Sequence, residues 1–256
     1  MKLTPLNPAQ AFLLLKLEKA TDQELLKYTF LHLIYNNILK IHHEWRIPHP
    51  RDPTPRLHTL LSKGSNFHLF PQLAYQHPFT HPFIREDKSY PLFPFLQEIG
   101  TKYWHNDYKL TQVYPYLVRH HYFNSSLGLK NYGLFFLTKK GKDVQKRIDY
   151  QLGEAEIELP HLIKSSPQKT VLLLQELGAN VLLLQCFHQE LIMQFRSVDF
   201  TAFQKLLIDG IGGLHLENFL TVFTYFQLPF ERVFVSHKAI PHEEYFDFFD
   251  LLNFGK

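Results

Sequence analysis

Apolar residues recur at helical spacing in two segments near the start of the chain. Residues 8–17 place Phe and Leu on one face, and Asn7 followed by Pro8 is typical of a helix start. The next segment opens with Thr21 and Glu24, which match a capping box, and its apolar positions keep helical spacing as far as Ile38. We therefore predict two N-terminal helices.

The region that follows is rich in proline and aromatic residues. Residues 38–50 predict a short strand or extended segment, and the prolines from Pro48 to Pro55 favour extended backbone. Residues 54–64 predict a short helix that ends at Gly64. Residues 65–92 predict a proline- and aromatic-rich linker that packs on the surface.

The middle of the chain combines helical spacing with one short apolar run. Residues 94–104 and 107–123 predict helices, with Pro115 at a first turn or a kink. Residues 131–133 predict the tip of a hairpin or a bulge, and Gly133–Leu137 the return strand. Thr138 is predicted to cap a helix whose first turn holds Gly141 and which runs through Ile148.

The C-terminal part changes in composition after Gly153. "EAEIELP" predicts a short alternating acidic segment, and Ser166 and Pro167 predict a helix start. "VLLLQ" occurs at 171–175 and again at 181–185, which predicts two buried helices joined by a turn. Two amphipathic helices, a strand at 230–237 and an acidic aromatic tail at 242–254 follow. We expect the tail to pack on the basic part of the chain, on a partner or on a second copy.

The order of elements in residues 93–150 resembles the winged-helix superfamily. Two helices are followed by a strand hairpin and by a helix that opens with "LTKKGKDV". A weak likeness between residues 24–41 and 108–125 predicts a tandem of two such units, although the first lacks a clear wing. We therefore predict an α+β, mostly helical protein: two winged-helix-like units followed by a helical C-terminal part. We predict a winged-helix-like unit at 1–64, a proline- and aromatic-rich linker at 65–92, a second winged-helix-like unit at 93–153 and a helical C-terminal domain at 154–256.

A weaker resemblance concerns the Golgi-phosphoprotein-three family. The helix pair in "PQKTVLLLQELGANVLL" and the order of the preceding helices carry the likeness. The resemblance implies binding of a phosphoinositide at a membrane surface. The tryptophan–arginine lipid pocket of that family has no match here, because Trp45 and Arg46 are the nearest pair and lack its spacing. No site residue is carried over from this family.

Composition and charge narrow the functional classes. The single cysteine, Cys186, excludes an intramolecular disulfide, and the absence of a secretory signal or a long apolar run favours a cytoplasmic protein. Residues 61–150 carry 12 Lys and Arg against 6 Asp and Glu, whereas residues 151–256 carry 7 against 13. This asymmetry indicates either different roles for the two parts or attraction between them.

No motif for catalysis, phosphate binding or metal binding is evident. The 16 histidines include the pairs His42–His43, His77–His81 and His120–His121, but Pro78 and Pro82 interrupt the helical spacing of the second pair. We therefore expect no enzyme activity, metal, cofactor or small-molecule substrate. Basic residues in the middle unit could contact nucleic-acid phosphates. This nucleic-acid set comprises Lys109, Gln112, Arg119, Lys130, Lys139, Lys140, Lys142, Lys146 and Arg147.

Three functional hypotheses follow from the sequence. The first is a non-enzymatic protein-interaction or scaffolding protein that binds a protein partner or a second copy of itself, because the first unit presents tyrosines and few basic residues. The second is a DNA-binding transcriptional regulator. The third is a phosphoinositide or membrane-surface binder.

Overall fold

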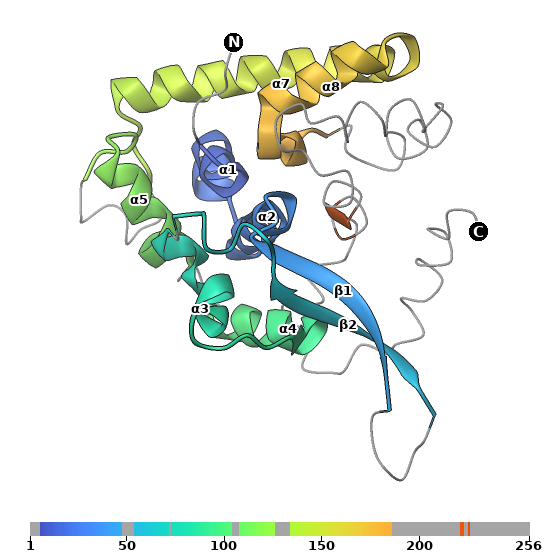
Figure 1. Ribbon diagram of the computed structural model, residues 1–256. Coiled ribbons are helices and arrows are strands. Elements are labelled where there is room, and N and C mark those ends of the chain that lie inside the picture. The colour runs from blue at the N-terminus through green and yellow to red at the C-terminus, as the bar shows by residue number, and fades with distance from the viewer. Residues whose placement is uncertain are drawn as a thin grey trace.

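The described residues form a mostly helical α+β protein with one small antiparallel sheet. The computed structural model describes residues 6–47, 54–71, 73–103, 108–125 and 134–185, together with 221, 222 and 225. The sheet has three strands in the order β1-β2-β3. Figure 1 shows helices α7 and α8 along one side of the molecule and the β1–β2 hairpin projecting on the opposite side, with α1 and α2 between them.

Both predicted N-terminal helices are confirmed. Helix α1 (Pro8–Lys16) begins at the cap formed by Asn7 and Gln10, and the short 3-10 turn η1 (Leu17–Lys19) follows it. Helix α2 (Asp22–Tyr35) begins at the predicted capping box, in which Thr21 and Glu24 satisfy each other's backbone N–H groups. Leu13 and Leu14 of α1 and the leucines of α2 are buried, so these local signals also fix the first layer of the core.

The predicted helix at 54–64 is wrong, because these residues form strand β2 (Arg56–Lys63). They pair along their whole length with β1 (Leu39–Arg46), from Leu39 opposite Lys63 to Arg46 opposite Arg56. Strand β3 (Tyr90–Pro91) extends the sheet. Gly64 closes the base of the hairpin, and its N–H donates to the carbonyl of Ile38 at 2.9 Å. Pairing with β1 therefore outweighed the local helical preference of this segment.

The linker expected at 65–92 contains regular elements and core residues. It holds the 3-10 turn η2 (Ala74–Gln76) and helix α3 (His77–Arg85), and helix α4 (Leu92–Lys102) follows, as predicted. Tyr75, Phe79 and Phe83 are fully buried in the same core cluster as α1 and α2. The prolines therefore begin and shape short helices here.

The stretch before Thr138 forms a bridge instead of the predicted strand. Within the described residues 134–137, a single antiparallel bridge joins Phe123 to Leu137. Pro115 lies in the first turn of α5 (Tyr114–Arg119), as predicted, after the π-helical turn η3 (Lys109–Val113). The Thr138 hydroxyl accepts the N–H of Gly141 at 3.0 Å, which confirms the predicted cap of α7 (Lys139–Ser165).

Helix α7 continues far beyond the predicted change at Gly153. The expected alternating segment "EAEIELP" is wrong, because α7 includes it and passes through Pro160. The buried residues along α7 recur every three or four positions, which is the helical period. These residues are Val144, Ile148, Leu152, Ala155, Leu159 and Ile163. The boundary predicted between 153 and 154 falls in the middle of this helix.

The end of the described chain is partly as predicted. Helix α8 (Pro167–Leu177) begins at Pro167, but the second "VLLLQ" contributes to the short 3-10 helix η4 (Gly178–Leu183) instead of an α-helix. None of the described helices combines the length and the apolar character needed to cross a bilayer. The predictions for Lys130, the tip at 131–133, Cys186 and the C-terminal helices, strand and tail lie outside the described residues, apart from helical positions at 221, 222 and 225.

Candidate functional site

The outer half of the β1–β2 hairpin exposes large apolar side chains. Trp45, on one face of β1, is 66% exposed, and Ile47, directly after the strand, is 59% exposed. Leu57 lies opposite Trp45. Nearer the body, Leu39 and Ile41 on this same face are buried in the core. The apolar stripe of β1 thus continues past the point where the rest of the described protein covers it.

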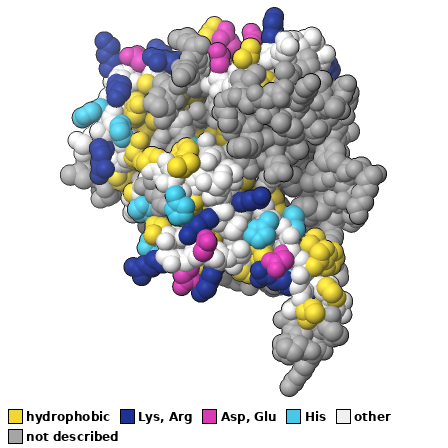
Figure 2. Space-filling view, viewed as in Figure 1, with side chains coloured by type: hydrophobic (Ala, Val, Ile, Leu, Met, Phe, Trp, Pro, Cys, Tyr) yellow, Lys and Arg dark blue, Asp and Glu magenta, His cyan; other side chains and the backbone are white. Residues whose placement is uncertain are grey.

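Basic side chains lie on the other face of the hairpin from these apolar residues. Lys40, Arg46 and Arg56 lie on the opposite face, and Arg46 bonds to Glu44 at 2.6 Å. The hydrogen bond from Arg46 lowers the pKa of the Glu44 carboxyl, so that this acid stays ionised beside its partner. Figure 2 shows yellow hydrophobic side chains on the hairpin beside Lys, Arg and His side chains. We define the hairpin patch as Lys40, Trp45, Arg46, Ile47 and Leu57.

Strand β1 is also an edge of the sheet. Its hydrogen bonds within the described residues go to β2 on one side. An edge strand of this kind offers backbone N–H and C=O groups to an added strand. The hairpin patch therefore combines an apolar anchor, positive charge and an edge strand in the described structure.

Most of the predicted nucleic-acid set gathers where α5 ends and α7 begins. The Lys140 ammonium donates to the carbonyl of His120 at 2.9 Å, which links the start of α7 to the end of α5. It also lies over the ring of Tyr122. The exposed members define a basic corner, which consists of Arg119, Lys139, Lys140, Lys142, Lys146 and Arg147.

The other members of the predicted set lie elsewhere. Lys109 is buried, and its ammonium donates to the carbonyls of Ala20 at 2.7 Å and Glu18 at 3.3 Å. Its backbone N–H donates to the carboxylate of Asp22 at 2.7 Å. Burial lowers the pKa of the Lys109 ammonium, although nearby Asp22 opposes the shift. Gln112 is half-buried, so it contributes little to the basic corner.

The histidine pairs do not form a metal centre in the described part of the chain. His77 and His81 lie one turn apart on α3, so the expected interruption by Pro78 and Pro82 is wrong. Proline is tolerated at the start of a helix, and Pro82 is accommodated within the last turn of this short one. No group of three or more His, Cys, Asp or Glu side chains among the described residues could hold a metal ion.

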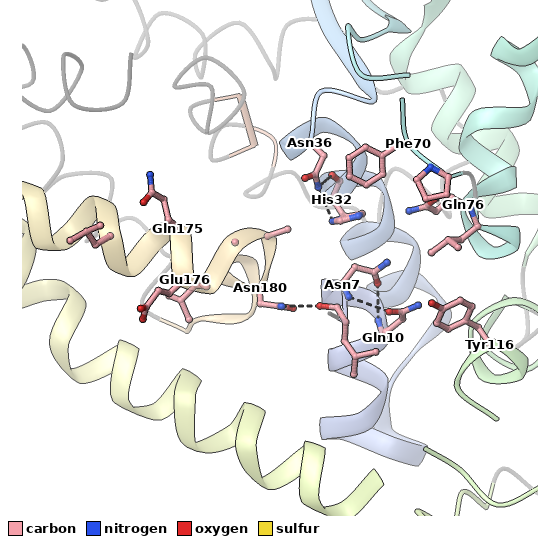
Figure 3. Close-up of a pocket in the computed structure, with 17 residues that line it drawn as sticks. Asn7, Gln10, His32, Asn36, Phe70, Gln76, Tyr116, Gln175, Glu176 and Asn180 are labelled. Atoms are coloured by element: carbon pink, nitrogen blue, oxygen red, sulfur yellow. Dashed lines mark hydrogen bonds between the residues drawn. The ribbon is translucent and has the colours of Figure 1, made fainter. Parts of the chain in front are cut away.

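A cavity of about 670 Å³ lies among α1, α2, α8 and η4 (Figure 3). Carboxamide side chains dominate its polar lining, and we name it the amide cavity. These side chains are Asn7, Gln10, Asn36, Gln76, Gln175 and Asn180. Figure 3 shows them approaching the same space from elements that are distant in the sequence. Its volume is within the range of small-molecule sites in proteins.

Sequence reasoning missed both the hairpin patch and the amide cavity. The assignment of 54–64 to a helix left Trp45 without a paired strand, because residues 57–61 lack the apolar–polar alternation that indicates a strand. The cavity joins residues from the beginning and the end of the described chain, which no local pattern brings together. Comparisons with known protein families, with curated proteins and with solved structures find no match to this chain.

Proposed function

We propose that this chain is a protein-interaction or scaffolding protein whose contact surface is the hairpin patch. The exposure of Trp45 on a projecting hairpin carries the proposal. Tryptophan and arginine are the residues that most often dominate binding free energy in protein interfaces. An exposed tryptophan beside a second large apolar residue, rimmed by polar groups, is typical of an interaction site.

The charges of the patch specify the kind of partner. Lys40 adds positive charge, whereas the charge of Arg46 is paired with Glu44. A partner segment with acidic residues would therefore complement the patch electrostatically. The edge of β1 favours an extended segment, which could add to the sheet through backbone hydrogen bonds. The proposed partner is a protein that presents an acidic, extended segment with an apolar side chain for Trp45.

Replacing Trp45 with Ala should weaken binding of such segments by about thirtyfold, the effect of losing a hot-spot side chain. Peptides would first be selected from a random displayed library against the full chain, and their Kd measured by fluorescence anisotropy. We expect the selected peptides to be acidic. The side chain of Trp45 is mostly exposed, so the variant should keep the stability of the parent.

The matched control is Leu69→Ala. Leu69 is 79% exposed on a different segment, so its removal should leave the Kd unchanged. Selected peptides that bind Trp45→Ala and the parent equally would contradict the proposal. A parent that yields no acidic peptide but binds anionic vesicles would favour the membrane-surface alternative.

We propose DNA binding through the basic corner as the second candidate function. The side chains of Lys139, Lys142 and Lys146 extend from the first turns of α7 into solvent, next to Arg119. The bridge from Phe123 to Leu137 and the capped start of α7 are compatible with a winged-helix-like unit over about 93–150. However, α5 offers one charged side chain, Arg119, which favours phosphate contacts over base readout.

Replacing Lys139, Lys140 and Lys142 together by Ala should weaken duplex binding and reduce its salt dependence. If all three contact phosphates, the slope of log Kd against log salt concentration should fall by up to about 3. A triple variant at the exposed Lys88, Lys102 and Lys164 is the control and should keep the parental slope. Failure of the intact chain to bind duplex DNA at low salt would exclude this second function.

A further inference from the structure

A second cavity lies between α3 and α4, beside β3, and has a volume of about 570 Å³. Aromatic side chains from β3 and from α4 and its C-terminal end line it, and we name it the ring cavity. These side chains are Tyr90, Phe95 and Tyr103. Prolines of α3 and Ile99 of α4 add further apolar surface. A cavity of this size and composition can hold a small molecule with an aromatic ring.

The aromatic wall of the ring cavity is held in place by the core. Phe95 is 6% exposed and packs against the fully buried Phe83, with ring centroids 5.7 Å apart. The Tyr90 ring lies 5.8 Å from that of Phe95, and the Tyr90 hydroxyl donates to the carbonyl of Pro82 at 3.4 Å. Tyr90 and Tyr103 are half-buried, so each has ring surface that a ligand can contact. A wall that is already ordered lowers the entropy cost of binding an aromatic ring.

Two opposite charges on α4 border this wall. Glu98 and Lys102 both line the cavity, and both side chains are exposed and therefore within reach of a ligand. A glutamate four residues before a lysine is the arrangement that favours an ion pair on a helix. Among the described residues, however, neither side chain has an ion-pair partner, and the Lys102 ammonium lies 5.5 Å from the centre of the Tyr103 ring. An anionic and a cationic group are thus available at the same cavity.

Helix α3 contributes two imidazoles to the lining. His77 and His81 lie one turn apart and are exposed. An imidazole N–H donates a hydrogen bond in both the neutral and the protonated ring, so these residues can assist Lys102 in holding an anionic group. Glu98 supplies the acceptor for a cationic group.

This combination of charges favours a ligand that carries both signs. Glu98 would repel a ligand with a carboxylate alone, and Lys102 would repel a ligand with an ammonium alone. The Cβ atoms of residues four apart on a helix lie about 5–6 Å from each other. The ammonium and carboxylate of an α-amino acid are attached to one carbon atom, so a single molecule between the two side chains can contact both.

We propose that the ring cavity binds a free α-amino acid with an aromatic side chain. The ammonium of the ligand pairs with the Glu98 carboxylate, and its carboxylate pairs with the Lys102 ammonium. Its ring packs against Tyr90 and Tyr103. This site is separate from the hairpin patch and does not depend on the proposed protein interaction.

The test compares phenylalanine with three analogues that each lack one feature. Hydrocinnamate lacks the ammonium, phenethylamine lacks the carboxylate, and leucine lacks the aromatic ring. Ligand-observed NMR with the full chain would measure their Kd values, with concentrations up to about 10 mM because compounds this small bind weakly. We expect phenylalanine to bind at least about fivefold more tightly than hydrocinnamate or phenethylamine, and more tightly than leucine. In methyl-labelled protein, the signals of Ile99 should shift with phenylalanine, and those of Ile163 on α7 should not.

Single substitutions test each ion pair separately. Glu98→Gln should weaken binding of phenylalanine at least about fivefold but should not weaken binding of hydrocinnamate, which has no ammonium. Lys102→Gln should weaken binding of phenylalanine to a similar extent but should not weaken binding of phenethylamine, which has no carboxylate. Both positions are exposed, so both variants should keep the parental melting temperature. The controls Glu158→Gln and Lys164→Gln, at exposed positions of α7, should leave the Kd of phenylalanine unchanged.

Several outcomes would overturn the proposal. It is wrong if phenylalanine does not bind, or if any of the three analogues binds as tightly as phenylalanine. It is also wrong if the Ile99 signals do not move, or if Glu98→Gln and Lys102→Gln bind phenylalanine as tightly as the parent does. The titrations of the parent decide the question even if a variant fails to fold.

Discussion

Replacing Gly141 with Ala is expected to lower the free energy of unfolding by about 3 kcal/mol. A Cβ at this position would lie 2.1 Å from the backbone oxygen of Tyr122 and 3.0 Å from its carbonyl carbon. That same oxygen accepts the N–H of Thr138 at 3.0 Å, next to the bridge between Phe123 and Leu137. The backbone would have to move and would disturb the start of α7. Thermal unfolding should show a melting temperature lower by about 10 °C.

Gly153→Ala is the matched control in the same helix. No heavy atom lies within 4 Å of a Cβ built at Gly153, and this residue is exposed in the interior of α7. Alanine restricts the unfolded chain more than glycine does, so this variant should gain about 0.5–1 kcal/mol of stability. Equal effects of the two substitutions would show that close packing at Gly141 is not the reason for its glycine.

The stability of the folded chain should fall as the pH drops from about 6.5 to about 4 because of His32. Burial lowers the pKa of its imidazole in the folded state to about 4, whereas the unfolded value is 6.5. Between these values the unfolded state binds a proton that the folded state excludes, so protons favour unfolding. The full shift corresponds to about 3 kcal/mol. Denaturant unfolding at several pH values would measure this loss.

His32→Asn should remove this part of the acid-induced loss of stability. Asparagine retains an oxygen that can accept from Asn36 but has no proton to bind in this pH range. The variant is expected to be less stable at pH 7 because a smaller side chain leaves a void. His121→Asn is the control: His121 is exposed, and its positive φ of 61° suits asparagine. If His32→Asn retains the parental dependence on pH, the assignment to His32 is wrong.

Local signals in the sequence predicted several helix starts correctly. Asn7, Thr21 and Thr138 each cap a helix at the predicted position, and Pro167 begins α8. A cap works through hydrogen bonds to residues two or three positions away, so the chain segment alone contains all the information needed. The same holds for Pro115, whose fixed φ and missing N–H suit the first turn of α5.

Strands were predicted less well than helices. Most of the segment 54–64 forms strand β2, because β1 lies beside it and pairs with it residue by residue. Conversely, the apolar run at 134–137 lacked a partner of comparable length among the described residues and forms one bridge. Strand formation depends on a second strand that can come from any distance, whereas helical hydrogen bonds stay within four residues.

The sequence by itself determined the helix starts, the mostly helical class and the apolar faces, because caps and periodicity act over a few residues. Only the tertiary structure decided which of these residues meet. It placed Trp45 on a projecting hairpin. It also buried Lys109, a member of the predicted nucleic-acid set, where its ammonium donates to the carbonyl of Ala20, and it brought Asn180 into hydrogen-bonding contact with Leu6. The last two contacts join segments far apart in the chain, and their geometry depends on packing of the whole core.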